Sequence, residues 1–393
     1  MAQQASVRRR SLTKRLLAAA LTLGTVGALS AATPPGLVEP PRKADHGFRE
    51  TDLVSDLAGR AQKQDPNLVN PWGLAPANTG EVWVSDNGSD KATTYDGAVD
   101  GQPVNILPRV VSIPEGGSPT GVVRSDTDDF RFSGFGKSGA ARFLFAGENG
   151  DLFAWSPDVS PTEAVRVAHE DSDGETAVFK GLALVRAEGE KDEKGEERGK
   201  DDRCDESRIL VANFRDARID VFDTSFNLVP PSAGRFQDPE LPKGFAPFNV
   251  KTIGSKVFVT YALQNDEKKD DVPGAGNGFI DVYSAEGKLV QRFASRGELN
   301  SPWGLEVAPK GFGKFSGDLL VGNFGDGHIN AYDEKTGRFE GTLKDRNGKP
   351  IVIPGLWGLL RGTEKSGGKD SIWFAAGIEE ENHGLLGILR AED

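Results

Sequence analysis

Cysteine is almost absent from this chain of 393 residues, because Cys204 is the only one. A single cysteine leaves no partner within the chain for a disulfide and no paired-cysteine metal site. Cys204 lies in a highly charged stretch, residues 188–206, which cannot bury apolar area and is predicted to be a solvated loop. We interpret Cys204 as an incidental exposed cysteine; a reactive thiol and an intermolecular disulfide are the alternatives. The sequence also lacks a nucleophile elbow, a phosphate-binding loop and a dinucleotide-binding fingerprint.

Long hydrophobic runs are missing too, apart from residues 16–29 near the N-terminus. This run of about 14 residues is too short to span a bilayer comfortably, and it follows basic residues and precedes small ones. Residues 1–32 are therefore predicted to be a signal peptide, of either the Sec or the twin-arginine type, and the protein is expected to be secreted or extracytoplasmic. Residues 33–47 are rich in proline and are predicted to be a flexible linker.

Positive charge is scarce, with 47 Lys and Arg against 59 Asp and Glu and a formal net charge of −12 at pH 7. The first 32 residues hold five basic side chains, so removing them from −12 leaves −17. Such a surface repels nucleic acids and anionic membranes, so neither is expected as a partner. We expect a monomer without membrane insertion after signal removal, whose partner is an unknown small molecule, a polysaccharide or an extracellular protein.

A repeated four-residue motif is the most informative feature that is present. Its copies lie between 48 and 68 residues apart, and each opens a short apolar strand. The six copies are Pro71-Trp72-Gly73-Leu74, Pro119-Thr120-Gly121-Val122, Phe179-Lys180-Gly181-Leu182, Pro247-Phe248-Asn249-Val250, Pro302-Trp303-Gly304-Leu305 and Leu356-Trp357-Gly358-Leu359.

An apolar run, a polar turn and a further strand follow each copy. The runs and the residues to which they lead are Val82-Trp83-Val84 and Tyr95, Phe143-Leu144-Phe145 and Trp155, Ile209-Leu210-Val211 and Phe222, Val257-Phe258-Val259 and Tyr283, Leu319-Leu320-Val321 and Tyr332, and Ile372-Trp373-Phe374 and Leu389. Repeats of this kind predict an all-β chain, with residues 48–393 forming a six-bladed β-propeller.

The last repeat ends too close to the C-terminus to supply its own outer strand. Residues 51–57, by contrast, precede the first repeat and alternate as an edge strand does. We therefore predict that this N-terminal segment completes the last blade and closes the ring, which removes the open sheet edges.

The motif Pro302-Trp303-Gly304-Leu305, the stretch N-F-G-D-G-H at 323–328 and the closing stretch G-I-E-E-E-N-H-G-L-L-G at 377–387 carry a family resemblance. Over nearly all of residues 48–393, the chain resembles a family of secreted bacterial propeller proteins of undetermined function. It is more distantly similar to NHL-repeat propellers and to propellers of the streptogramin-lyase and gluconolactonase types. That resemblance implies six blades. The similar family of undetermined function implies no mechanism. Among the more distantly similar propellers, metal-dependent lactonases and lyases use acidic, amide and imidazole groups around the central channel.

Because strands of a blade alternate in direction, the start of each inner strand and the turn between strands two and three should lie at the same mouth of the channel. Those turns are rich in oxygen ligands, which a Ca²⁺ ion or another divalent cation prefers; the alternative is that Asn, Asp and Gly serve only the turns themselves. The candidate metal ligands are Asp86, Asn87, Glu148, Asn149, Asn213, Asp216, Asn323 and Asp326.

Two further groups are candidates at this mouth. Five motif residues, Trp72, Lys180, Phe248, Trp303 and Trp357, either contact a ligand, with Lys180 meeting an anionic group, or wedge between neighbouring blades. His383, in the turn Glu379-Glu380-Glu381-Asn382-His383, is either a catalytic base or metal ligand or a structural imidazole bonded to a neighbouring blade.

The sequence therefore favours an exported propeller that binds a small ligand or an extracellular partner at the channel mouth. A divalent-metal-dependent lactonase or lyase, and an adhesion or matrix-binding module, are the alternatives.

Overall fold

A computed structural model of the chain describes residues 46–172, 174–186 and 206–392. The predicted signal peptide, nearly all of the linker and Cys204 lie outside these residues. The described residues are built from β-strands and short 3-10 turns, without an α-helix, and they offer no helix long and apolar enough to cross a membrane.

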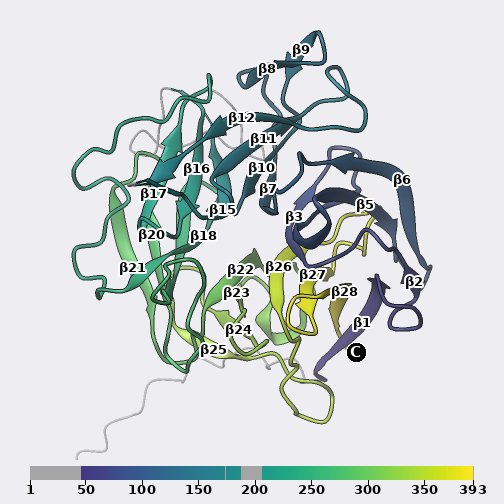
Figure 1. Cartoon of the computed structure of the whole chain (residues 1–393). Coiled ribbons are helices and arrows are strands. Elements are labelled where there is room, and N and C mark those ends of the chain that lie inside the picture. The colour runs from purple at the N-terminus through teal and green to yellow at the C-terminus, as the bar shows by residue number, and fades with distance from the viewer. Residues whose placement is uncertain (1–45, 173, 187–205, 393) are drawn as a thin grey trace, which may run out of the picture. The chain divides into compact units, whose positions relative to one another are not determined.

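The strands form six sheets that are arranged as the blades of a propeller (Figure 1). From the inner to the outer strand, blade 1 contains β3 (Pro71–Pro76), β4 (Val82–Asp86), β5 (Lys91–Gly97) and β6 (Val104–Ser112), and blade 2 contains β7 (Pro119–Arg124), β10 (Phe143–Gly147), β11 (Asp151–Trp155) and β12 (Val165–His169). Blade 3 contains β15 (Phe179–Val185), β16 (Arg208–Asn213) and β17 (Arg218–Phe222), and blade 4 contains β18 (Phe245–Ile253), β19 (Lys256–Leu263), β20 (Phe279–Tyr283) and β21 (Leu289–Ser295). Blade 5 contains β22 (Pro302–Val307), β23 (Leu319–Asn323), β24 (Ile329–Tyr332) and β25 (Phe339–Thr342), and blade 6 contains β26 (Leu356–Arg361), β27 (Ser371–Ile378), β28 (His383–Ala391) and β1 (Phe48–Ser55).

Smaller elements decorate this ring. A hairpin of β8 (Arg131–Gly134) and β9 (Lys137–Ala140) interrupts blade 2, and β13 (Asp171–Ser172) pairs with β14 (Glu175–Thr176) before blade 3. The two-residue strand β2 (Lys63–Gln64) runs parallel to β1, and the 3-10 turns η1 and η3 span Asn87–Ser89 and Gly313–Phe315.

The predicted strand pairs are confirmed in all six blades. In each blade the residue that opens the apolar run lies opposite the residue to which the run was expected to lead: Val82 and Tyr95, Phe143 and Trp155, Ile209 and Phe222, Val257 and Tyr283, Leu319 and Tyr332, and Ile372 and Leu389.

Strand β1 closes the ring, as predicted, although it spans Phe48–Ser55 rather than 51–57. It pairs antiparallel with β28 from Phe48 opposite Ala391 to Ser55 opposite Leu385, so the two ends of the propeller lie side by side (Figure 1). The last sheet therefore contains strands from opposite ends of the chain.

The alternation of side chains along the strands explains how each blade is buried on both faces. Trp83 of β4 packs in the cluster shared with blade 2, whereas its neighbours Val82 and Val84 pack in the cluster shared with blade 6. Comparable clusters lie between each of the remaining pairs of neighbouring blades, and one more cluster lies among the inner strands.

The glycine of the repeated motif is required by the close approach of the inner strands. A Cβ atom added at Gly358 would lie 2.4 Å from the carbonyl oxygen of Trp72 in the next blade, and one at Gly304 would lie 2.7 Å from that of Trp357. Blade 4 carries Asn249 at this position instead, and its amide donates a hydrogen bond of 2.8 Å to the carbonyl of Trp303. Each inner strand therefore touches the next around the axis of the propeller.

Candidate functional site

Aromatic side chains from the repeated motif fill the space enclosed by the inner strands. The rings of Trp72 and Trp357 stack with centroids 3.5 Å apart, and Phe324 stacks on Trp357 at 3.9 Å. Trp303 stands nearly perpendicular to Trp72 and to Trp357, and Phe248 contacts Trp357 as well. We call these five residues the aromatic plug.

Four rings of the plug are buried and Phe324 is partly buried, so the aromatic faces mostly contact one another instead of the solvent. Trp357 is 1% exposed, and both Trp72 and Phe324 stack on it with ring centroids less than 4 Å away. The rings pack on one another among the inner strands, whereas the alternative given for these positions was that they wedge between neighbouring blades. Direct contact of Trp72, Phe248, Trp303 or Trp357 with a ligand stays a prediction.

A polar network lies next to the plug and centres on Lys180 of the inner strand β15. The Lys180 ammonium donates a hydrogen bond of 2.5 Å to Glu148 Oε1, lies 3.6 Å from Asp270 Oδ1 and lies 5.1 Å from the ring centroid of Trp72. Glu381 is also close enough to act on the charge of Lys180. Two carboxylates thus pair with the ammonium, and the charge of a third acts on it.

Two asparagines connect this network to blade 1. Asn87 donates a hydrogen bond of 3.2 Å to Glu148, and Asn70, which directly precedes β3, donates one of 2.8 Å to Glu381. The amide of Asn70 also bonds to Asn87 at 3.3 Å. We call the residues of this network the mouth set: Asn70, Asn87, Glu148, Lys180, Asp270 and Glu381.

The turns between strands two and three supply most of the mouth set. Asn87 follows β4, Glu148 follows β10, Asp270 follows β19 and Glu381 follows β27. The expectation that these turns meet the starts of the inner strands on one face therefore holds for blades 1, 2, 4 and 6, and Lys180 adds blade 3.

Burial and neighbouring charges set the protonation of the mouth set. Burial alone would raise the pKa of Glu148 and lower that of Lys180, but the ion pair between them outweighs burial and shifts both pKa values the other way, so both groups are charged. Glu381 differs, because burial, followed by the charges of Glu148 and Asp270, raises its pKa in spite of the bond from Asn70 and the charge of Lys180. The network therefore has more negative charge than one lysine can balance.

The carboxylates lie nearer the solvent than the lysine does. The Lys180 side chain is 3% exposed, whereas those of Glu148 and Asp270 are 17% and 56% exposed. The Lys180 ammonium, which the sequence offers to an anionic group, is therefore already paired and is covered by acidic groups.

The candidate metal ligands do not form one group. Asn87 and Glu148 belong to the mouth set, but Asn149 bonds to Asp151, Asn213 bonds to Asp216 and Asp220, and Asn323 bonds to Asp326, each within its own blade. Asp86 is fully buried and accepts a hydrogen bond of 2.8 Å from Thr93. Among residues 46–172, 174–186 and 206–392, no cluster of three His, Cys, Asp or Glu side chains has the geometry of a metal site.

His383 contacts the closing strand rather than the mouth set. Its Nδ1 lies 2.7 Å from Asp56 Oδ2, just beyond β1, and Asp56 Oδ1 accepts a hydrogen bond of 2.8 Å from the backbone of Gly384. The hydrogen bond to Asp56 raises the pKa of His383. This arrangement joins the two ends of the chain within blade 6, and a catalytic role for His383 stays a prediction.

Three members of the mouth set, Asn70, Asp270 and Glu381, are not among the site residues predicted from the sequence, although Glu381 lies in the turn that contains His383. Asp270 lies in the charged insertion 264–278, which resembles a solvated lid, and Asn70 precedes the repeated motif by one position in blade 1. The sequence did offer one signal for Asn70: blade 5 also has an asparagine shortly before its copy of the motif, because Asn300 lies two residues before Pro302.

The geometry defines the class of the protein as a six-bladed β-propeller with a polar mouth over an aromatic plug. No family model matches the chain. It is 32% identical over 354 residues to "Uncharacterized protein R648" of Acanthamoeba polyphaga mimivirus, covering 89% of this chain and 82% of that protein. It is also 32% identical over 365 residues to "Uncharacterized protein L690" of the same virus, covering 89% and 87%.

The chain therefore belongs to the family of these uncharacterised mimivirus proteins. These relatives are viral, so they do not support the bacterial and secreted family that the resemblance implied. Among solved structures, a "Streptogramin B lyase structure" is similar over 88% of this chain and 97% of that chain, with 11% identity and a TM-score of 0.44. The assignment of six blades depends on the strand pairing of the chain itself.

Proposed function

We propose that the chain is an exported propeller that binds a cationic small ligand, or a basic side chain of an extracellular partner, at the channel mouth. The observation that carries this proposal is that Lys180 pairs with carboxylates from two other blades, Glu148 and Asp270, while the charge of Glu381, from a third, also acts on it. Export is proposed from the signal-like sequence of residues 1–32.

The expected charge of the ligand follows from how deeply each charged side chain of the mouth set is buried. A molecule that approaches from solvent meets the carboxylates before it meets Lys180, because the lysine is the most buried of the charged groups. Burial, with a smaller contribution from the charges of Glu148 and Asp270, raises the pKa of Glu381; a cation placed there would stabilise its carboxylate, whereas an anion would add to the repulsion. The excess of acidic residues over the whole chain attracts cations in the same way.

The turn that presents Glu381 gives independent support. Glu379, Glu380 and Glu381 have φ angles of +53°, +58° and +65°, a region that residues other than glycine rarely adopt. Strained backbone of this kind costs about 1–3 kcal/mol per residue and concentrates at functional sites. Three successive glutamates in this conformation exceed what a turn between two strands requires.

Calorimetric titration with spermidine, a small polycation, tests the proposal. We expect saturable binding by the chain without residues 1–32, and an affinity on the order of tenfold lower in Glu381→Gln, because a hydrogen bond to a charged group contributes about 1.5–3 kcal/mol. Asp270→Asn should weaken binding less, since that side chain is 56% exposed.

Asp266→Asn is the matched control, because Asp266 is exposed on the same insertion as Asp270. It removes one negative charge without changing the mouth set. Loss of affinity in Asp266→Asn equal to that in Glu381→Gln would show a diffuse charge effect, and it would overturn the assignment of the site.

A further inference from the structure

Blade 3 lacks a fourth strand among the described residues. After β17 the chain turns back, and Asp223 and Asn227 close the turn with a backbone hydrogen bond of 3.0 Å. Leu228 then forms a single bridge with Phe222, and Val229 donates a hydrogen bond of 2.7 Å to the carbonyl of Val221. Residues 230 and 231 are both proline, which has no N–H to continue the ladder, so the pairing stops.

The early stop leaves the outer edge of β17 without a partner strand, although Ile219 and Val221 are largely covered by other residues. The carbonyl of Val221 faces outward, since it accepts the bond from Val229, and Ile219 presents its N–H and C=O on the same side because backbone groups alternate along a strand. Within the described part of the chain, these two groups of Ile219 have no backbone partner on that side. An unpaired strand edge is a template for another strand.

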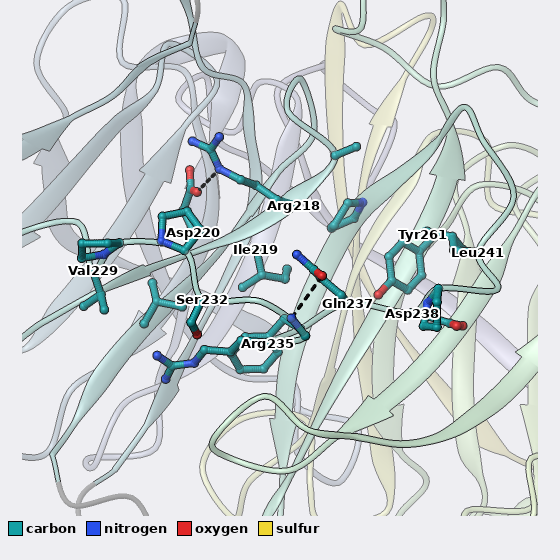
Figure 2. A pocket seen from close by; sticks show the side chains of 18 residues that line it. Arg218, Ile219, Asp220, Val229, Ser232, Arg235, Gln237, Asp238, Leu241 and Tyr261 are labelled. Atoms are coloured by element: carbon teal, nitrogen blue, oxygen red, sulfur yellow. Dashed lines mark hydrogen bonds and ion pairs between the residues drawn. The ribbon is translucent and has the colours of Figure 1, made fainter.

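A pocket of about 430 Å³ lies beside this edge, between blades 3 and 4. This volume is within the range of roughly 300–1,000 Å³ that ligand pockets occupy. Its walls come from β17, from the loop of residues 229–241 and from Pro247 and Tyr261 of blade 4, as Figure 2 shows for ten of the lining residues. Ile219, Val229 and Leu241 contribute apolar surface, so the pocket suits an apolar side chain.

Blade 4 shows what a fourth strand brings to the equivalent position. Strand β17 reads R-I-D-V-F and strand β20 reads F-I-D-V-Y, so Asp220 corresponds to Asp281. In blade 4 the fourth strand, β21, places Arg292 opposite Asp281 and forms an ion pair with it, and the next residue, Phe293, is buried. The fourth strand thus delivers a basic residue followed by an apolar one.

Asp220 is buried at the corresponding point of blade 3, and in the part of the chain that the structure describes its one cationic partner is Arg218 of the same strand. It is 2% exposed, lines the pocket and is bonded to Asn213 and to Arg218 of its own strand, the second contact being drawn in Figure 2. Burial raises its pKa despite these two bonds, so a further positive charge would stabilise the carboxylate.

We propose that the pocket is a docking site for an extended peptide segment of a partner protein, which adds to β17 as the fourth strand of blade 3. The peptide pairs with the backbone of Ile219, brings a basic side chain to Asp220 and places an adjoining apolar side chain in the pocket. This site is separate from the channel mouth, and its occupant is recognised by backbone pairing and charge together.

A synthetic peptide with the sequence of residues 287–297, which contains β21, is a suitable probe. We expect its fluorescence anisotropy to rise saturably on titration with the chain lacking residues 1–32. The same peptide carrying Arg292→Gln and Phe293→Ala should bind at least tenfold more weakly. Equal binding of the two peptides, or no saturable binding of the first, would overturn the proposal.

Two variants of the protein locate the binding. Ile219→Pro removes the outward N–H while leaving the pairing with β16 intact, and Ser232→Trp fills the pocket from an exposed loop position. Both should lose at least tenfold in affinity, whereas the control Ile219→Val should bind as wild type does. If Ile219→Pro unfolds at a lower temperature than the wild type, the test depends on Ser232→Trp. Unchanged peptide binding in Ser232→Trp would refute the site. Glu381→Gln should leave peptide binding intact, which separates this test from that of the channel mouth.

Discussion

Replacing Gly358 by alanine tests whether the inner strands touch around the axis. The new Cβ would lie 2.4 Å from the carbonyl oxygen of Trp72 and 3.1 Å from Leu74 Cγ. Ordinary contact begins near 3.4 Å, so the strands would have to separate by about 1 Å, although the stacked rings of Trp72 and Trp357 hold them together. Overpacking of this kind costs about 1–3 kcal/mol, and we expect the upper part of that range because the clash is with backbone.

Urea unfolding of the two proteins, followed by tryptophan fluorescence, measures this effect as a shift of the midpoint. Gly139→Ala is the matched control: Gly139 lies in the β8–β9 hairpin, and a Cβ there would come no closer than 3.3 Å to its neighbours. The control should change the free energy of unfolding by less than about 1 kcal/mol, because the atoms nearest to its new Cβ belong to side chains, which can shift, and not to backbone. If Gly358→Ala is equally mild, the contact between inner strands is not as tight as described.

Three further predictions concern charge and metals. Burial and a neighbouring carboxylate raise the pKa of Glu50 in β1 to about 7, and the hydrogen bond to the Asp56 carboxylate raises that of His383, so the folded closure binds protons more tightly than the unfolded chain does. Stability should therefore fall as pH rises from about 4.5 through 7 and beyond the raised pKa of His383, and the double variant Glu50→Gln/His383→Gln should show a flatter dependence of the urea midpoint on pH; an unchanged slope would contradict this. Lys180→Met should cost about 3–5 kcal/mol because it leaves Glu148 buried without its cation, and adding Glu148→Gln should recover part of that loss; a double variant less stable than Lys180→Met would argue against the pair. The metal hypothesis predicts bound Ca²⁺ on the purified chain and a lower unfolding temperature in EDTA, and neither being observed would remove the metal-dependent lactonase or lyase.

The repeats made the architecture predictable. The motif at Trp72 and its copies gave the six inner strands, and the pairing of residues such as Val82 with Tyr95 followed from the spacing between apolar runs. The closing role of the N-terminal segment followed from the short C-terminal remainder. These features are local patterns repeated along the chain, so they can be read without knowing any contact between blades.

The site was harder to predict because its contacts join residues far apart in the sequence. Turn chemistry and a shared mouth both favour Asn and Asp, so composition could not tell that Asn213 bonds within its own blade while Glu148 reaches Lys180. Asp270 was hidden in a charged insertion for the same reason. The proline pair that ends blade 3 was visible in the sequence, but the open edge at Ile219 depends on the direction of its backbone groups, which only the ladder defines.

A crystal structure of the chain without residues 1–32, soaked in spermidine, tests the central claim most directly. The account predicts an ammonium group of the ligand within hydrogen-bond distance of oxygens from at least two of Glu148, Asp270 and Glu381, with the aromatic plug unchanged beneath them. Spermidine bound only elsewhere on the surface, with the mouth set open to water, would contradict it.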